Sequence, residues 1–227
     1  MEDSLQARIE SPSVDLFPEK SVMRASFFSD ESFAKDGDRR GKIALAMDAC
    51  VRDKGYAATS LTDIALKAQM SPSHIRYYFD GKEEILEFYL AAICDQIVRD
   101  VGAIVRKTPE QWAKDFTGYF ITNPDLTKAT VMLMVEIFAV SAHNPKLMKI
   151  KSRYDNFIRQ TLTEFFQWAG TIDGVTPEDA AYRLWAFEGG MKFNSMFQSD
   201  FSKEKAGLIF HDELLRLSGL SGKKKRG

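Results

Sequence analysis

The sequence contains only two cysteines and three histidines among its 227 residues. Cys50 and Cys94 are too far apart to form a Cys-x-x-Cys motif. The histidines, His74, His143 and His211, show no spacing typical of a metal site or a catalytic triad, and no glycine-rich phosphate-binding loop is present. These absences predict a protein without a metal, a cofactor or catalytic activity. A helical hydrolase with dispersed catalytic residues stays open as an alternative.

Long apolar runs and a secretion signal are also missing. The longest apolar run, Val131–Val140, is interrupted by Glu136 and is too short to cross a bilayer. No charged start, apolar stretch and cleavage site open the chain. We therefore expect a cytoplasmic protein without membrane contact. In that reducing compartment Cys50 and Cys94 are interpreted as small buried hydrophobes, with a redox-sensing pair as the alternative.

Alternating apolar patterns of useful length are absent, which excludes a sheet and leaves an all-α fold. Five of the seven prolines follow a residue that can cap a helix, and proline is favoured at the first helical position. These pairs are Ser71-Pro72, Thr108-Pro109, Asn123-Pro124, Asn144-Pro145 and Thr176-Pro177. About nine helices are predicted. They are 39–54, two short helices capped by Ser60 and Ser71, one from Gly81 or Lys82 to about Lys107, and 109–122, 124–142, 145–169, 177–198 and 202–217.

The two short helices have the pattern of a helix-turn-helix. Ser60 with Asp63 resembles a capping box, and the apolar residues that follow (Leu61, Ile64, Ala65, Ala68) recur at helical spacing. In the second helix Ile75 and Phe79 are four residues apart and point inward. Its other side chains (Ser73, His74, Arg76, Tyr77) then face outward. A helix of this kind can enter the major groove of DNA.

The distribution of charge supports a nucleic-acid interface at the same place. The formal net charge of the whole chain is −1. Residues 1–38 carry four basic and nine acidic side chains, a balance of −5, whereas residues 39–82 carry eight basic and four acidic, a balance of +4. Positive charge is therefore concentrated on the candidate DNA-binding segment.

This segment resembles the DNA-binding domain of the TetR family of transcriptional regulators, from about Arg40 to Leu90. The matching residues are Ile43, Ala46, Met47, Cys50, Gly55, Thr59-Ser60-Leu61, Asp63-Ile64-Ala65, Met70-Ser71, Tyr78-Phe79 and Lys82-Glu83-Glu84-Ile85-Leu86. The resemblance implies that the protein contacts operator DNA through Ser60, Thr62, Ser71, Pro72, Ser73, His74, Arg76, Tyr77, Tyr78 and Lys82. Of these, Ser60, Thr62, Tyr78 and Lys82 are expected to contact mostly phosphates.

Two positions depart from the family pattern. Gln69 stands in the turn where the family usually has glycine, and we expect it to adopt a left-handed conformation at a cost of about 1 kcal/mol. Arg76 stands where the family usually has tyrosine. Because arginine favours phosphate or guanine O6/N7, the operator sequence is expected to differ from those of relatives with tyrosine.

The second half of the chain is rich in aromatic residues and methionine, and the TetR resemblance implies an effector-binding and dimerisation domain there. Methionine and aromatic side chains can line an adaptable apolar pocket, although ordinary core packing is the alternative for each of them. The predicted ligand-binding residues are Trp112, Phe116, Phe120, Met134, Glu136, Phe138, Phe187 and Met191. Glu136 is either a buried structural acid or a polar anchor for an apolar or amphipathic effector.

The predicted organisation is a flexible arm (1–38), a helix-turn-helix domain (39–85), an effector-binding and dimerisation domain (86–218) and a basic tail (219–227), either disordered or in contact with phosphates. The last two helices are expected to form a homodimer through Leu184, Glu188 and Met191 on one and Ile209, Leu214 and Leu217 on the other. The mid-helix pair Gly189-Gly190 fits close approach of a partner helix or a ligand.

A homodimer of this kind would present two recognition helices to a pseudo-palindromic operator. We expect a repressor that a small molecule releases from DNA, with the helix that begins near Lys82 as the mechanical link. An activator, and a helical adaptor that binds only protein, are the alternatives. The sequence does not identify the effector, the operator sequence or the regulated genes.

Overall fold

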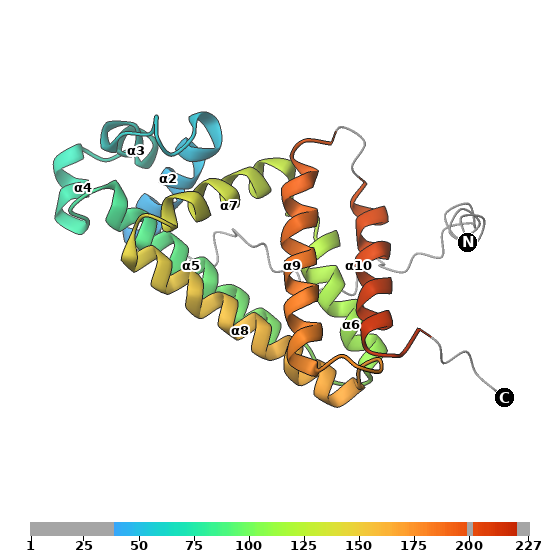
Figure 1. Cartoon of the computed structure of the whole chain (residues 1–227). Helices are drawn as coiled ribbons and strands as arrows, with labels where there is room; N and C mark the ends of the chain where they lie inside the picture. Colours follow the sequence, from blue (N-terminus) through green and yellow to red (C-terminus); the bar gives the residue numbers. More distant parts are fainter. Residues whose placement is uncertain (1–38, 199–201, 222–227) are drawn as a thin grey trace.

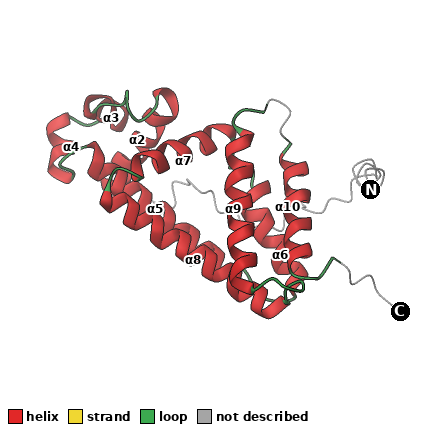
Figure 2. Ribbon diagram, in the orientation of Figure 1, coloured by secondary structure: helices red, strands yellow, loops and turns green. Residues whose placement is uncertain are grey.

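The computed structural model describes residues 39–198 and 202–221, so the predicted arm (1–38) and residues 222–227 of the predicted tail lie outside the described residues. The described chain forms nine α-helices, one π-helical segment and no strand (Figure 2). This confirms the all-α prediction. The elements are α2 (Arg39–Lys54), α3 (Leu61–Ala68), α4 (Pro72–Tyr78), α5 (Lys82–Gly102), α6 (Pro109–Thr117), η2 (Gly118–Thr122), α7 (Lys128–Ser141), α8 (Pro145–Ala169), α9 (Pro177–Ser195) and α10 (Lys203–Leu217).

The helices form two regions joined by long elements (Figure 1). Helices α2, α3 and α4 pack together at one end of the molecule, and α6, α9 and α10 lie at the other. Helices α5 and α8 run side by side between the two ends, and α7 reaches from α2 to α9. A single hydrophobic core extends through both regions. Two connections, α5 and α7, therefore lead from the small module into the larger one.

Four of the five predicted cap-and-proline pairs begin helices as expected. Ser71 Oγ accepts the backbone N–H of His74 at 3.1 Å, and Thr108 and Thr176 cap α6 and α9 in the same way. Asn144 Oδ1 accepts from the first turn of α8. Each side chain satisfies a backbone donor that the helix itself leaves unpaired.

The predicted start of α7 at Pro124 is wrong. Asn123 Oδ1 instead accepts the N–H of Asp125 at 2.9 Å, which makes a turn, because asparagine bonds readily to the backbone two residues on. The helix begins after Thr127, whose Oγ1 accepts the N–H of Thr130 at 3.2 Å. This shift places the first turn of α7 beside α2.

Helix α5 also differs from the expected length. It ends at Gly102, not near Lys107, in keeping with the low helix propensity of glycine. It is continuous through residue 85, where we expected the boundary of the DNA-binding domain. Both regions therefore share one rigid helix. Among the described residues, no helix combines the length and the apolar character needed to span a membrane.

Gln69 ends α3 in the left-handed region, with φ 56° and ψ 45°, as the sequence predicted. Its N–H satisfies carbonyl oxygens of the last turn of α3. A left-handed conformation costs a residue with a side chain about 1–2 kcal/mol, and glycine avoids that cost while losing more chain entropy on folding.

We therefore expect Gln69→Gly to raise the free energy of unfolding by about 0.5–1 kcal/mol in urea denaturation. Lys67→Gly, two residues earlier and inside α3, is the matched control and should lower it by about 1 kcal/mol. Equal destabilisation by both variants would contradict the conformational explanation.

Candidate nucleic-acid interface and effector domain

Helix α4 has one buried and one exposed face. Ile75 and Phe79 are 0% and 1% exposed and anchor the helix to α2 and α5, as the sequence predicted. Ser73, His74, Arg76 and Tyr77 are all exposed. The ring of Tyr77 packs edge-on against that of Tyr78, with centroids 5.0 Å apart, yet Tyr77 is 81% exposed. Arg76 has no intramolecular partner among the described residues, so its guanidinium is available to a ligand.

Several of the other predicted DNA-contacting residues also make contacts that stabilise the fold. Ser60 and Asp63 form the predicted capping box of α3, and the Lys54 ammonium and Ser60 hold the pKa of Asp63 well below its usual range. The Ser71 hydroxyl caps α4, and Pro72 opens that helix on the exposed side. Thr62 is exposed and Tyr78 is half-buried. The structure thus gathers all ten predicted residues around α3, the turn and α4.

Lys82 makes more contacts within the protein than we expected. Its Nζ donates to the carbonyl oxygens of Tyr56 and Thr59, at 3.0 Å each, and lies 4.4 Å from the centroid of the Tyr56 ring. Lys82 therefore fixes the connection between α2 and α3. A phosphate contact would use its remaining N–H.

Arg40 positions the end of α4, a role that the sequence analysis missed. Its Nη1 donates to the carbonyl oxygen of Tyr78 at 3.2 Å, and its guanidinium lies 4.2 Å from the centroid of the Phe79 ring. A second ring, that of Phe88, lies 4.9 Å away. Stacked on two aromatic faces, this arginine closes the module at the end of the recognition helix. An arginine among other basic residues gives no sequence signal for such a role.

Hydrogen bonds connect α5, α2 and α7. The buried Tyr89 hydroxyl of α5 donates to Asp48 of α2, and burial raises the pKa of Tyr89 well above its usual value. Arg52 Nε donates to the same carboxylate at 2.7 Å, while its Nη1 donates to Thr130 Oγ1 of α7 at 3.1 Å. The first turn of α7 is thereby tied to the DNA-binding module.

Glu136 of α7 makes a second hydrogen bond to the DNA-binding module. Its Oε1 accepts the backbone N–H of Tyr56, just after α2. Gly55 allows this approach, since it has φ 83° and a Cβ there would lie 3.1 Å from Glu136 Oε1. Of the two interpretations left open for Glu136, this geometry favours the structural acid. It also makes α7, which the sequence did not single out, a second link beside α5.

Both cysteines are buried. Burial raises the pKa of Cys94 to about 12 and raises the pKa of Cys50 above its usual value. Because the thiolate is the reactive form, these environments favour the structural interpretation of both residues. Within the two described stretches, no cluster of three His, Cys, Asp or Glu side chains could hold a metal ion.

Most of the predicted ligand-binding aromatics pack tightly against one another. Trp112 stacks on Phe116 and on Phe165, with centroids 4.8 and 4.6 Å apart, and Phe116 contacts Phe120 at 4.6 Å. Phe187 stacks on Phe210 at 6.4 Å. These rings fill the core between α6, α8, α9 and α10 and line neither of the two cavities described next. The geometry favours core packing over the ligand role that we predicted for these four aromatics.

Cavities in the larger region include a smaller and a larger one that contain predicted residues. The smaller, about 20 Å³, lies between α5, α7 and α8 and is lined by the predicted residues Met134 and Phe138. The larger, about 260 Å³, lies between η2, α7, α9 and α10 and includes Met191. The structure thus divides the predicted pocket residues between two cavities and the core, except for Glu136, which bonds to the Tyr56 backbone.

The predicted dimer face on α9 and α10 is partly wrong. Leu184, Glu188, Leu214 and Leu217 are buried inside the protomer, because they close the core against α6 and α8. The exposed side of the same helices carries large apolar residues instead. These residues are Tyr182, Phe193, Phe197, Leu208 and Ile209.

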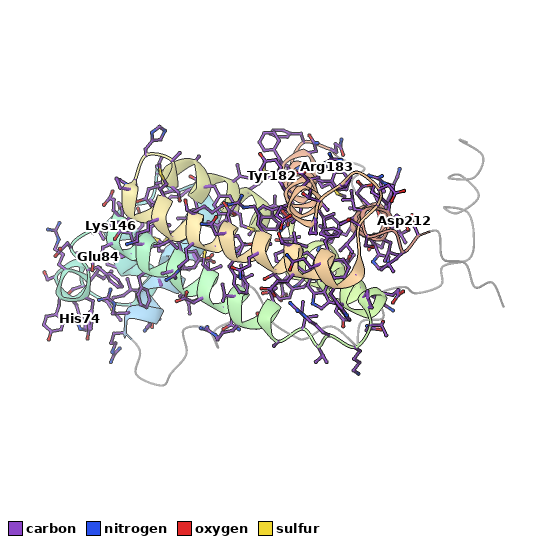
Figure 3. All side chains as sticks on the ribbon, turned by 60° about the horizontal axis from the view of Figure 1, so that its bottom comes forward. His74, Glu84, Lys146, Tyr182, Arg183 and Asp212 are labelled. Carbon is purple, nitrogen blue, oxygen red and sulfur yellow. The ribbon has the colours of Figure 1, made fainter. Side chains whose placement is uncertain are left out.

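Exposed positions of α9 and of the turn that follows it form a continuous stripe. Tyr182, Ala186, Gly189, Phe193 and Phe197 recur at intervals of three or four residues, and all are exposed. A Cβ on Gly189 or Gly190 would meet nothing within 4 Å, so space is left for a neighbouring helix. Figure 3 shows His74 at the α4 end and Tyr182, Arg183 and Asp212 well away from it on α9 and α10.

An all-α chain with an exposed polar helix after a tight turn defines a helix-turn-helix protein. Residues 48–88 match the family model described as bacterial regulatory proteins, tetR family. The curated HTH-type transcriptional regulator BetI 1 of Chromohalobacter salexigens is 24% identical over 136 residues, which cover 57% of this chain and 65% of that protein.

Solved structures share the fold across nearly their whole length. A transcriptional regulator from Rhodococcus sp. Rha1 gives a TM-score of 0.70 at 17% identity, covering 78% of this chain and 95% of the other. A regulator from Saccharomonospora viridis, solved in complex with choline, gives 0.63 at 20% identity, covering 76% and 93%. The family match thus places residues 48–88 in a DNA-binding segment of the tetR type. The solved structures show that the chain shares the overall fold of these regulators.

Proposed function

We propose that the protein is a repressor that binds a pseudo-palindromic operator as a homodimer and leaves it when a small effector binds the larger region. The observation that carries DNA binding is the division of α4 into a face anchored by Ile75 and Phe79 and an exposed face with Ser73, Arg76 and Tyr77. Side chains on such a face reach base edges and phosphates in the major groove. The protein would act in the cytoplasm, by binding and not by catalysis.

The exposed stripe on α9, with Leu208 and Ile209 of α10, supports the dimer. An exposed apolar patch of this extent on a soluble helix pair marks an interaction surface. Two copies of the pair would form a four-helix bundle with two-fold symmetry. That symmetry would set the recognition helices toward major grooves roughly 34 Å apart.

Release from DNA would use both α5 and α7. Because of the hydrogen bonds from Arg52 to Thr130 and from Tyr56 to Glu136, α2 would move together with α7. The hydrogen bond from Tyr89 to Asp48 would couple α2 to α5 in the same way. An effector that prefers a different placement of α7 would change the spacing of the two α4 helices. Only such a difference in affinity between two conformations can shift the equilibrium.

Choline, the ligand in the Saccharomonospora viridis structure, does not suit the larger cavity here. Proteins bind quaternary ammonium groups with aromatic faces. Among the described residues, the lining of the larger cavity holds three lysines and no aromatic side chain. We therefore do not propose choline as the effector of this protein.

Footprinting on the DNA around the protein's own gene tests the proposal. We expect one protected pseudo-palindrome that overlaps a promoter and is bound by a dimer in sedimentation analysis. A protected site upstream of the promoter would favour the activator. Absence of protection anywhere in that neighbourhood, at low salt and micromolar protein, would contradict DNA-binding regulation of adjacent genes.

Arg76→Ala is expected to change base preference, because the free guanidinium can bond bidentately to guanine. Discrimination at one symmetric base pair should fall by about 1–3 kcal/mol, or roughly 5- to 150-fold, while other positions keep theirs. Selection from a randomised operator library measures this. Arg159→Ala, at an exposed position of α8, removes the same charge away from DNA and should leave preference unchanged. A uniform loss at every position in Arg76→Ala would contradict direct base contact.

A further inference from the structure

The larger cavity, of about 260 Å³, combines an apolar wall with a cationic one. The apolar wall consists of Ile121, Leu126, Val131 and Met191, three of them buried to 96% or 94%. A dry cavity of about 150 Å³ accommodates benzene, so this one fits roughly ten heavy atoms. The thioether of Met191 lets that wall adapt to the shape of an aliphatic chain.

The cationic wall consists of Lys128, Lys192 and Lys203. The Lys192 side chain is 14% exposed, and it pairs with the buried carboxylate of Glu188. Lys203 Nζ donates to the carbonyl oxygens of Asn123 and Pro124 at 3.2 Å each, and burial lowers its pKa. Lys203 Nζ is therefore held by neutral carbonyl oxygens and is paired with no carboxylate among the described residues.

Among the described residues, no acidic side chain lines this cavity. Glu188 neutralises Lys192 from behind the wall, and Asp125 and Glu204 act on Lys203 from a greater distance. Lys128 is exposed in the first turn of α7 and has no partner among the described residues. The charged side chains that the described lining offers to an occupant are therefore lysine ammonium groups. Lys192 and Lys203 are partly buried, and charges in such a setting attract an anion more strongly than in water.

We propose that this cavity binds an amphipathic anion, a carboxylate or phosphate ester on an aliphatic chain of about eight carbons. The acid group faces Lys128 and Lys203, and the chain lies against Val131 and Met191. An ammonium head group would be repelled by these lysines, and an uncharged hydroxyl could accept their hydrogen bonds but would gain no attraction between opposite charges.

This site deepens the proposed function, on which its regulatory role rests. Lys128 and Val131 flank Thr130, whose hydroxyl accepts the hydrogen bond from Arg52 of α2. An occupant that draws in Lys128 would move the same turn of α7 that holds the DNA-binding module. Binding in the cavity is thus coupled to α2 through one side chain.

Calorimetric titration of the full chain with octanoate, octyl phosphate, octanol and octylammonium tests the ligand class. We expect saturable binding of octanoate or octyl phosphate at least tenfold tighter than that of octanol, and none of octylammonium. Saturable binding of octylammonium or octanol as tight as that of both anions would overturn the proposal, as would no saturable binding of either anion below millimolar concentration.

Variants locate the site. Lys128→Met removes an exposed charge without disturbing the core and should weaken anion binding at least threefold, and Lys128→Met with Lys203→Met at least tenfold. Lys205→Met, at an exposed position of α10 outside the lining, is the matched control and should bind as the original chain does. Equal affinity in Lys128→Met and Lys205→Met would place the anion elsewhere and overturn the assignment.

Operator affinity is measured separately, with and without the bound anion. Anion binding that lowers operator affinity supports both the site and its regulatory role. Anion binding without any effect on DNA supports the site and contradicts only its role as effector site. Failure of the protein to bind DNA at all would contradict the proposed function and leave the titration result standing.

Discussion

Phe193→Asp is expected to convert the protein from a dimer into a monomer. Phe193 is 51% exposed in the protomer, in the last turn of α9 within the apolar stripe, and the centroid of its ring lies 5.3 Å from that of Phe197. In the proposed four-helix bundle this ring would become buried against the partner. A carboxylate there would lose its hydration without gaining a partner, which is costly in an apolar interface.

The loss of the dimer should strongly weaken operator binding. A dimer engages its second half-site at a high effective concentration, which raises affinity by about 10²–10⁴-fold over a single half-site. We expect the operator affinity of Phe193→Asp to fall by that factor in a gel-shift titration. The variant should also sediment as a monomer at about 10 μM protein. The folded protomer should persist, because the position is exposed within it.

Two controls separate the interface from general charge effects. Phe193→Leu keeps an apolar side chain and should remain dimeric. Asn156→Asp adds the same charge at an exposed position of α8 and should leave both the dimer and DNA affinity unchanged. A Phe193→Asp protein that still sediments as a dimer would show that the subunits meet through another face.

Glu136→Leu is expected to loosen the connection between α7 and the DNA-binding module. The Glu136 carboxylate accepts the N–H of Tyr56, and leucine leaves this donor without a partner next to a half-buried glycine. A donor left unsatisfied in that way costs about 1–3 kcal/mol. Local opening after α2 should become easier by the same free energy.

Hydrogen exchange measures this effect directly. The Tyr56 amide should exchange about 5- to 150-fold faster in Glu136→Leu. When the loop recloses quickly, the exchange rate follows the opening equilibrium, so this factor corresponds to the same 1–3 kcal/mol. Glu136→Gln keeps a carbonyl oxygen at the position of the acceptor and should retain most of the protection. Unchanged exchange in Glu136→Leu, or an equal rise in both variants, would rule out Glu136 as the acceptor that holds this loop.

Local signals predicted much of the DNA-binding module correctly. The capping box of Ser60 and Asp63, the left-handed Gln69 and the anchors Ile75 and Phe79 all follow from contacts within a few residues. Such features depend on backbone geometry that a short sequence fixes by itself. The same reasoning failed at Asn123, because its side chain can cap a helix or close a turn with equal ease.

Side-chain roles in the larger region were less predictable. Leu184 and Leu217 were assigned to the dimer face and are buried in the protomer, while Phe193 and Phe197 are exposed. Trp112 and Phe116 were assigned to a pocket and stack in the core. Periodicity shows that a helix has apolar faces, but an apolar face packs equally well against its own chain, a second copy or a ligand.

The sequence alone determined an all-helical chain, the helix-turn-helix with its exposed α4 residues, and the concentration of positive charge on that module. Tertiary structure alone decided that Glu136 and Thr130 of α7 hold α2, and that lysines from α7, α9 and α10 meet around one cavity. Helix caps and faces arise from residues close together in the chain. These contacts join residues about 80 positions apart, and only the packing of whole helices brings them together.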